Sequence, residues 1–133
     1  MAPANDDLVT LVTLVSWWSR LAPLVAEETR GLWFGMVDLD VDDAAKRHLY
    51  VAGCPTFDPD DEGDWACEYC WWPDERYVLL PSLAAFPDVQ HGIALQAAVD
   101  LVRTLDPTRS VPQVEGVGVG FDDGDFEIVW SVD

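Results

Sequence analysis

Residues 116–131, GVGVGFDDGDFEIVWS, carry the clearest fold signal of the chain. Two runs of alternating character flank the dipeptide Asp123-Gly124, a pattern typical of a β-hairpin with a two-residue turn. This turn fixes a register, and the register decides which side chains share a face. The pairs expected on one face, which we expect to be core, are Phe121 with Phe126, Val119 with Ile128, and Val117 with Trp130.

The other face of the same hairpin is almost bare along its first strand. Gly116, Gly118 and Gly120 alternate there, and the missing side chains let another backbone or a large ring come close. We expect a helix or a neighbouring tryptophan to cover these glycines. A groove for a ligand is the alternative.

Outward from this hairpin, apolar periodicity predicts the remaining elements. The expected helices are residues 5–22 and 88–105, and the expected strands are residues 32–39, 47–53, 65–72 and 76–80. Each helix also has apolar residues at helical spacing, which predicts its buried face. These residues are Leu8, Leu11, Val12, Val15, Trp18 and Ala22 in the first helix, and Val89, Ile93, Ala97, Leu101 and Leu105 in the second.

The order of these elements, α-β-β-β-β-α-β-β, predicts the fold class. We expect an α+β fold: a mainly antiparallel sheet of about six strands with two helices packed on one face. The length of 133 residues fits a single globular domain over residues 1–133.

Charge restricts the class of partner. The chain has 25 Asp and Glu against 7 Lys and Arg, a net charge of −18. Direct binding of nucleic acid needs cationic side chains for the phosphates, and an anionic membrane surface would repel this chain. We therefore expect neither partner, and we expect attraction to a basic protein instead.

Cysteine usage and the N-terminal segment predict the compartment. Three cysteines in a short chain are not the even set of a disulfide framework, which favours the cytoplasm. The apolar run at residues 8–18 is preceded by Asp6 and Asp7 where a signal peptide has basic residues. It is also shorter than the roughly 20 residues that a membrane span needs.

Metal binding is an alternative with two versions. Cys54, Cys67 and Cys70 could join a histidine in a zinc site, but on a strand Cys67 and Cys70 would project from opposite faces. The acidic loop at residues 58–64 begins like a calcium-binding loop, yet Tyr69 stands where a bidentate glutamate is required. We therefore expect no cofactor.

Catalytic patterns are equally weak. Neither His48 nor His91 has a neighbouring serine or cysteine in a recognisable nucleophile context. The alternating glycines at 116–120 precede no helix, so they do not form a phosphate-binding loop. We expect a protein that is not an enzyme.

Acids interleaved with aromatics form the candidate partner-binding surface. Tryptophan and tyrosine are frequent in binding hot spots, and surrounding carboxylates would orient a basic protein. Strand alternation at 65–72 assigns Trp65, Tyr69 and Trp71 to the inner face and makes Trp72 the candidate for exposure. The candidate residues are Asp58, Asp60, Asp61, Glu62, Asp64, Trp72, Asp74, Glu75, Asp122, Asp123 and Asp125.

These observations predict a small acidic, non-catalytic inhibitor that neutralises a basic protein. A bacterial toxin-immunity protein against a nuclease-type toxin is the most economical instance, and a nucleic-acid mimic is a related one. A small-ligand domain with a tryptophan-lined pocket is the other alternative besides metal binding.

Overall fold

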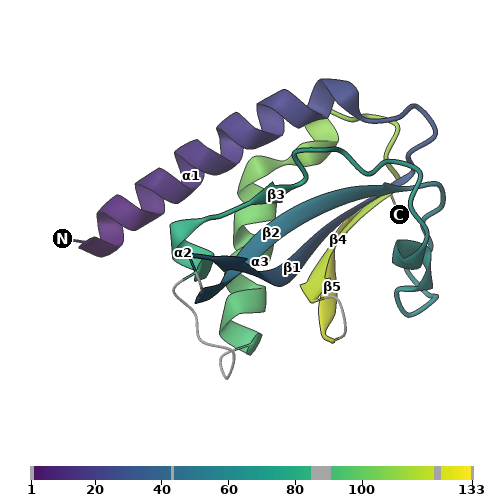
Figure 1. Ribbon diagram of the computed structural model, residues 1–133. Coiled ribbons are helices and arrows are strands. Elements are labelled where there is room, and N and C mark those ends of the chain that lie inside the picture. The colour runs from purple at the N-terminus through teal and green to yellow at the C-terminus, as the bar shows by residue number, and fades with distance from the viewer. Residues whose placement is uncertain (1, 43, 85–90, 122–123, 133) are drawn as a thin grey trace.

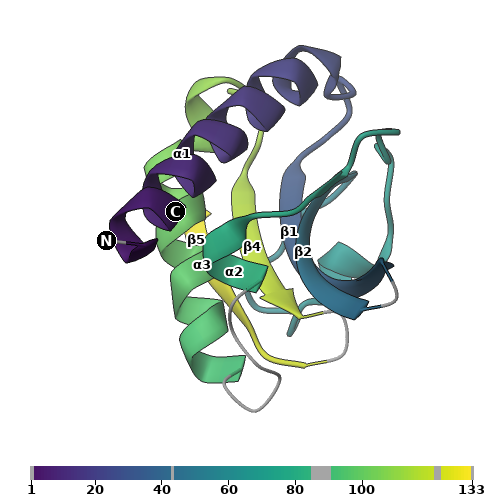
Figure 2. The same cartoon turned by 60° about the vertical axis from the view of Figure 1, so that its left-hand side comes forward.

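A computed structural model describes residues 2–42, 44–84, 91–121 and 124–132. The fold is α+β, with one mixed sheet that carries the longer helices α1 and α3 on one face (Figures 1 and 2). The helices are α1 (Ala2–Leu21), α2 (Pro81–Ala84) and α3 (His91–Leu105), and short 3-10 turns are η1 (Ala22–Leu24), η2 (Asp64–Cys67) and η4 (Pro107–Arg109). The strands are β1 (Gly31–Val41), β2 (Ala44–Cys54), β3 (Tyr77–Val78), β4 (Gly116–Phe121) and β5 (Phe126–Ser131).

The sheet differs from the expected one in pairing and in size. Its strand order is β3-β2-β1-β4-β5, and β1 pairs antiparallel with β2 but parallel with β4. The segment that contains α2 and α3 carries the chain across the sheet, so β4 returns in the same direction as β1. The sheet is therefore mixed and five-stranded in the described residues, whereas a mainly antiparallel sheet of about six strands was expected.

The expected strand at residues 65–72 is wrong. Gly63 adopts a left-handed conformation with φ of 89°, and the chain then turns through η2 instead of extending. Trp71 joins the sheet as an isolated bridge to Gly53, and the Cys70 amide also donates to the Gly53 carbonyl. As a result Trp65 and Trp71 do not share a face, because they pack in two different hydrophobic clusters on the two sides of the sheet.

Helix α1 confirms the first expected helix, but it turns a different face to the sheet. Trp18 is buried as expected, but it is joined by Leu14, Trp17 and Leu21, while Leu8 and Val12 are exposed. The indole of Trp17 lies edge-on to a sheet residue, Phe34, with 6.5 Å between ring centroids. The rotation of α1 about its axis is thus set by its largest side chains, which pack on the sheet. The leucines and valines nearer the N-terminus are turned outward as a result.

The buried face of helix α3 also differs from the predicted one. Ile93, expected in the core, is 55% exposed, whereas Ala94, Ala98 and Val102 are buried. Alanines at this spacing let the helix backbone approach the sheet closely, so the buried face lies one residue away from the predicted one. The expected cap at Asp88 and the apolar Val89 lie outside the described residues.

The C-terminal hairpin has the expected register only at its open end. Gly116 pairs with Ser131 and Val117 with Trp130, but a bulge between Val117 and Gly118 then shifts the pairing by one residue. Gly118 accordingly faces Ile128. A one-residue shift moves side chains to the other face, so Phe126 and Ile128 leave the helix side. Trp130, expected in the core, is 39% exposed.

The glycine face is covered, as expected, by aromatic rings. The side opposite the helices holds a second hydrophobic cluster built around Trp33, Tyr50 and Trp65. A Cβ at Gly118 would lie 2.9 Å from the Trp65 ring. The Phe57 ring occupies the corresponding space at Gly116, and the Phe126 Cβ with the Asp125–Phe126 backbone occupies it at Gly120.

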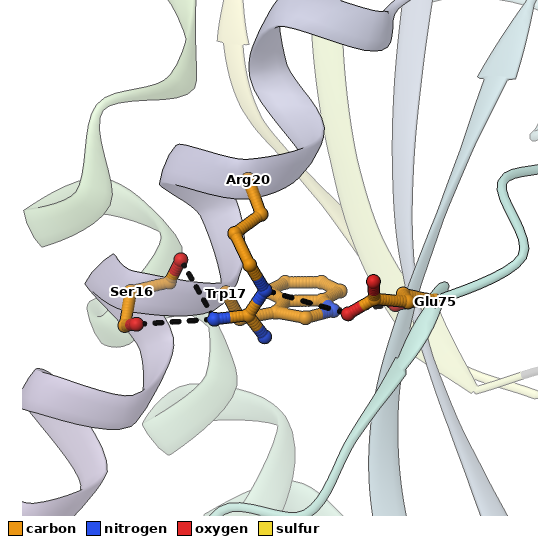
Figure 3. A network of polar contacts seen from close by, with 4 residues as sticks. All are labelled: Ser16, Trp17, Arg20 and Glu75. Atoms are coloured by element: carbon orange, nitrogen blue, oxygen red, sulfur yellow. Dashed lines mark hydrogen bonds and ion pairs between the residues drawn. The ribbon is translucent and has the colours of Figure 1, made fainter.

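A polar network joins α1 to the segment before β3 (Figure 3). The Trp17 indole Nε1 donates a 2.7 Å hydrogen bond to the Glu75 carbonyl, and Arg20 Nε lies 3.4 Å from Glu75 Oε2. Arg20 also donates to the Ser16 carbonyl and hydroxyl.

Among the described residues, no helix is both long enough and apolar enough to cross a membrane.

Candidate functional site

A pocket of about 510 Å³ opens on the side of the sheet opposite α1 and α3. We call it the aromatic pocket, because most of its wall is made of rings. The rings that line it are Trp33, Tyr50, Tyr69, Trp72, Tyr77, Phe121 and Phe126, and the carboxylate residues that line it are Glu62 and Asp64.

The base of the aromatic pocket is set by the β1–β2 pairing. Gly35 lies opposite Tyr50, and the Tyr50 ring fills the space above this glycine. The Trp33 indole Nε1 donates a 2.9 Å hydrogen bond to the Tyr50 hydroxyl. Because a buried indole N–H needs an acceptor, this bond fixes both rings in place.

One wall is built by residues that follow η2 and by β3. Tyr69 and Trp72 stack with 4.9 Å between centroids and 12° between planes. Trp72 and Tyr77 both meet the Tyr50 ring edge-on, at 5.8 and 6.0 Å. Trp72 is 42% exposed, which confirms the expected exposure, and Tyr69 and Tyr77 are exposed with it.

The guanidinium of Arg76 supports this wall from outside. It lies 4.3 Å from the Trp72 centroid and 4.9 Å from the Tyr77 centroid, within the range of a cation–π contact. Its Nη1 donates to the Pro73 carbonyl at 3.0 Å. Arg76 does not line the pocket, so it approaches the two rings from their other side.

The opposite wall brings two separate loops together. Gly63 lies against the Phe126 ring, since a Cβ at this glycine would be 3.2 Å away from it. Glu62, Gly63 and Asp64 therefore border the same cavity as Gly124 and Phe126. Residues 62–64 of the acidic loop and residues 124 and 126 of the last hairpin, far apart in sequence, thus meet at the aromatic pocket.

The predicted site residues divide into distinct groups in the structure. Glu62, Asp64 and Trp72 line the pocket, and Asp125 is exposed between two lining residues. Asp60 and Asp74 are exposed outside it, and Asp122 and Asp123 lie outside the described residues. Three others have structural contacts: Asp58 and Asp61 accept hydrogen bonds from the Asp60 and Gly63 amides, and Glu75 pairs with Arg20 on the helix side.

The cysteines do not gather into a metal site. Burial, and after it the nearby Cys70, Cys67 and Glu68 side chains, raise the pKa of the Cys54 thiol to about 12. In the metal-free protein this thiol is therefore protonated at neutral pH. In the ranges that the structure describes, no group of three or more His, Cys, Asp or Glu side chains could hold a metal ion.

Sequence reasoning missed most of the pocket lining. Trp33 and Tyr50 were assigned to strands without a face, and Tyr69 was assigned inward on a strand that does not form. The available signal was the uninterrupted apolar character of residues 32–37, since a strand buried on both faces lacks alternation. That signal would have indicated a second covered face on the sheet.

Comparison of the chain with protein-family models, with curated proteins and with solved structures found no match.

Proposed function

We propose that this chain is a non-catalytic acidic binding protein that neutralises a basic protein by covering its functional surface. The observation that carries the proposal is the aromatic pocket with carboxylates at its mouth, on a chain of net charge −18. Exposed tryptophan and tyrosine supply contact energy, and the surrounding negative charge supplies orientation and a fast encounter.

The internal charge balance supports a cationic partner. Each of the six arginines has a contact within the fold, through an ion pair, a backbone acceptor or an aromatic ring, and none of these ion pairs involves the acidic loop. The contacts are Arg20 with Glu75, Arg30 with the Glu27 and Thr29 carbonyls, Arg47 with Phe121, Arg76 with Trp72, Arg103 with Glu127, and Arg109 with Asp106. The surplus carboxylates at the pocket mouth are best balanced by a partner.

A nuclease-type toxin is the partner class that fits most economically, which would make this chain a bacterial immunity protein. Such a toxin is cationic because it holds phosphates, so an acidic antagonist can compete for the same surface. A nucleic-acid mimic directed at another DNA-binding protein would use the same complementarity.

The test is capture from an extract of the native host at low salt and again at about 0.5 M salt, where the Debye length falls to roughly 4 Å. The captured protein is then purified and its affinity measured for three forms of this chain. We expect a basic protein, and we expect Glu62→Gln with Asp64→Asn to weaken its binding about tenfold or more. The matched control, Glu28→Gln with Asp100→Asn, removes equal charge away from the pocket and should change affinity much less. Equal losses in both double variants, or no basic protein captured, would contradict the proposal.

A small cationic ligand is the second candidate, and the pocket volume favours it. About 510 Å³ lies within the range of small-molecule sites. This candidate gains support if the purified chain binds small cations tightly but retains no protein at low salt.

A further inference from the structure

We infer that the aromatic pocket receives an arginine side chain of the basic partner and that this arginine anchors the complex. The inference rests on the proposed function and adds the chemical group that the site recognises. It follows from the ring geometry, the charges at the mouth and the volume of the cavity.

The rings favour a flat cation. A guanidinium is planar and weakly hydrated, so it stacks on aromatic faces more readily than the compact, strongly hydrated ammonium of lysine. The protein already holds one guanidinium in this way, since Arg76 lies 4.3 Å from the Trp72 centroid. Tyr69 stacks on one face of Trp72 and Arg76 lies over the other, so a second guanidinium would meet the Tyr69 and Tyr77 rings, which Trp72 and Arg76 hold in place, rather than a face of Trp72.

The mouth supplies the acceptors that a guanidinium needs. Glu62 and Asp64 are the acidic residues in the pocket lining, and both are exposed. No basic residue lines the cavity in the part of the chain that the structure describes. Carboxylates and guanidinium pair through paired N–H donors, which adds directional preference to the attraction of unlike charges.

The volume indicates more than an isolated side chain. A space of about 510 Å³ holds an arginine together with parts of the neighbouring residues. The expected guest is therefore an arginine that projects from a loop of the partner, with its backbone crossing the mouth between the acidic loop and the last hairpin.

The test uses the full chain and three blocked tripeptides of the form glycine–X–glycine, with X as arginine, lysine or citrulline. Citrulline keeps the shape of arginine without its charge. Binding is measured by titration of the isotope-labelled protein, following the indole N–H signals of Trp33 and Trp72. We expect the arginine peptide to bind at least about tenfold more tightly than the citrulline peptide, and more tightly than the lysine peptide.

Variants separate the pocket from general attraction. Trp72→Ala should weaken the binding of the arginine peptide by about tenfold. Trp72→Phe keeps a ring and should retain most of the affinity. Because Trp72 is 42% exposed, neither change should unfold the chain. Asp100→Asn on α3 should leave the affinity unchanged.

Two outcomes would overturn the inference. One is equal binding of the arginine and citrulline peptides, or no shift of the Trp33 and Trp72 signals with any peptide. The other is tighter binding of lysine than of arginine. If the peptide titration gives either result while the host extract still yields a basic protein, the proposed function is retained and only the arginine anchor is rejected. If the peptide binds as expected but no basic protein is captured, the anchor stands and the proposed function falls.

Discussion

At the scale of single residues, burial determines the chemistry of the three cysteines. Cys54 is fully buried beside the second hydrophobic cluster, while Cys67 is exposed on η2. Desolvation disfavours a thiolate, so the Cys54 pKa rises to about 12 from an ordinary value of 9.0. The folded state therefore holds this proton more firmly than the unfolded state does.

This difference predicts a loss of stability in alkali. Above pH 9 the unfolded chain releases the Cys54 proton and the folded chain does not, so the free energy of unfolding falls as the pH rises. Between pH 8 and pH 10 the wild type should lose about 1.4 kcal/mol more than Cys54→Ala, a variant without this proton. Urea unfolding at the two pH values measures both losses. Parallel losses in the two proteins would show that Cys54 is not the group responsible.

At the scale of elements, strands β1 and β2 form the platform of the molecule. Each runs for eleven residues, and their alternate side chains pack on the helices or line the opposite side. Leu32, Phe34 and Met36 face the helices, whereas Trp33 faces the aromatic pocket. Gly35 completes this second face by leaving space for the Tyr50 ring.

Gly35→Ala tests this cross-strand contact. A Cβ at this position would collide with the Tyr50 ring, and overpacking of this kind typically costs about 1–3 kcal/mol. The Trp33 indole N–H signal should also move, because its acceptor is the displaced Tyr50 hydroxyl.

Gly92 provides the matched control for the same substitution. A Cβ there would meet nothing within 4 Å, and Gly92 lies in helix α3, where alanine is favoured by up to about 1 kcal/mol. Thermal unfolding of the two variants should therefore shift in opposite directions. A Gly35→Ala protein as stable as the wild type would mean that Tyr50 does not sit over this glycine.

At the scale of the whole molecule, the excess negative charge has an energetic cost. The −18 net charge is carried by a compact body whose two hydrophobic clusters fill both sides of one sheet. Self-repulsion opposes such a compact state, and dissolved ions screen it. Binding a cationic partner would relieve the same repulsion.

Screening predicts that salt stabilises the protein. Raising sodium chloride from about 10 mM to about 500 mM shortens the Debye length from roughly 30 Å to roughly 4 Å, so the melting temperature should rise by several degrees. The variant Glu28→Lys with Asp100→Lys carries less net negative charge and should show a smaller rise. Differential scanning calorimetry of both proteins measures the effect. A melting temperature that falls with salt would indicate that favourable ion pairs outweigh the repulsion.

The amino-acid sequence by itself predicted the local elements and the overall charge. Periodicity in α1 and α3 predicted two helices, because helix formation depends on neighbours three and four residues apart. The exposure of Trp72 was also predicted correctly, although from the alternation of a strand that does not form, and the missing side chains of the glycine face correctly predicted ring cover over Gly118.

Only the tertiary structure decided how these elements combine. The parallel pairing of β1 with β4, the rotation of both helices and the bulge beside Val117 depend on which surfaces meet across the sheet. The aromatic pocket depends on the same long-range packing, because Glu62, Trp72 and Phe126 reach it from three separate segments. Local periodicity determines the apolar face of an element to within about one residue. The contact with the neighbouring element then determines which residues on that side are buried.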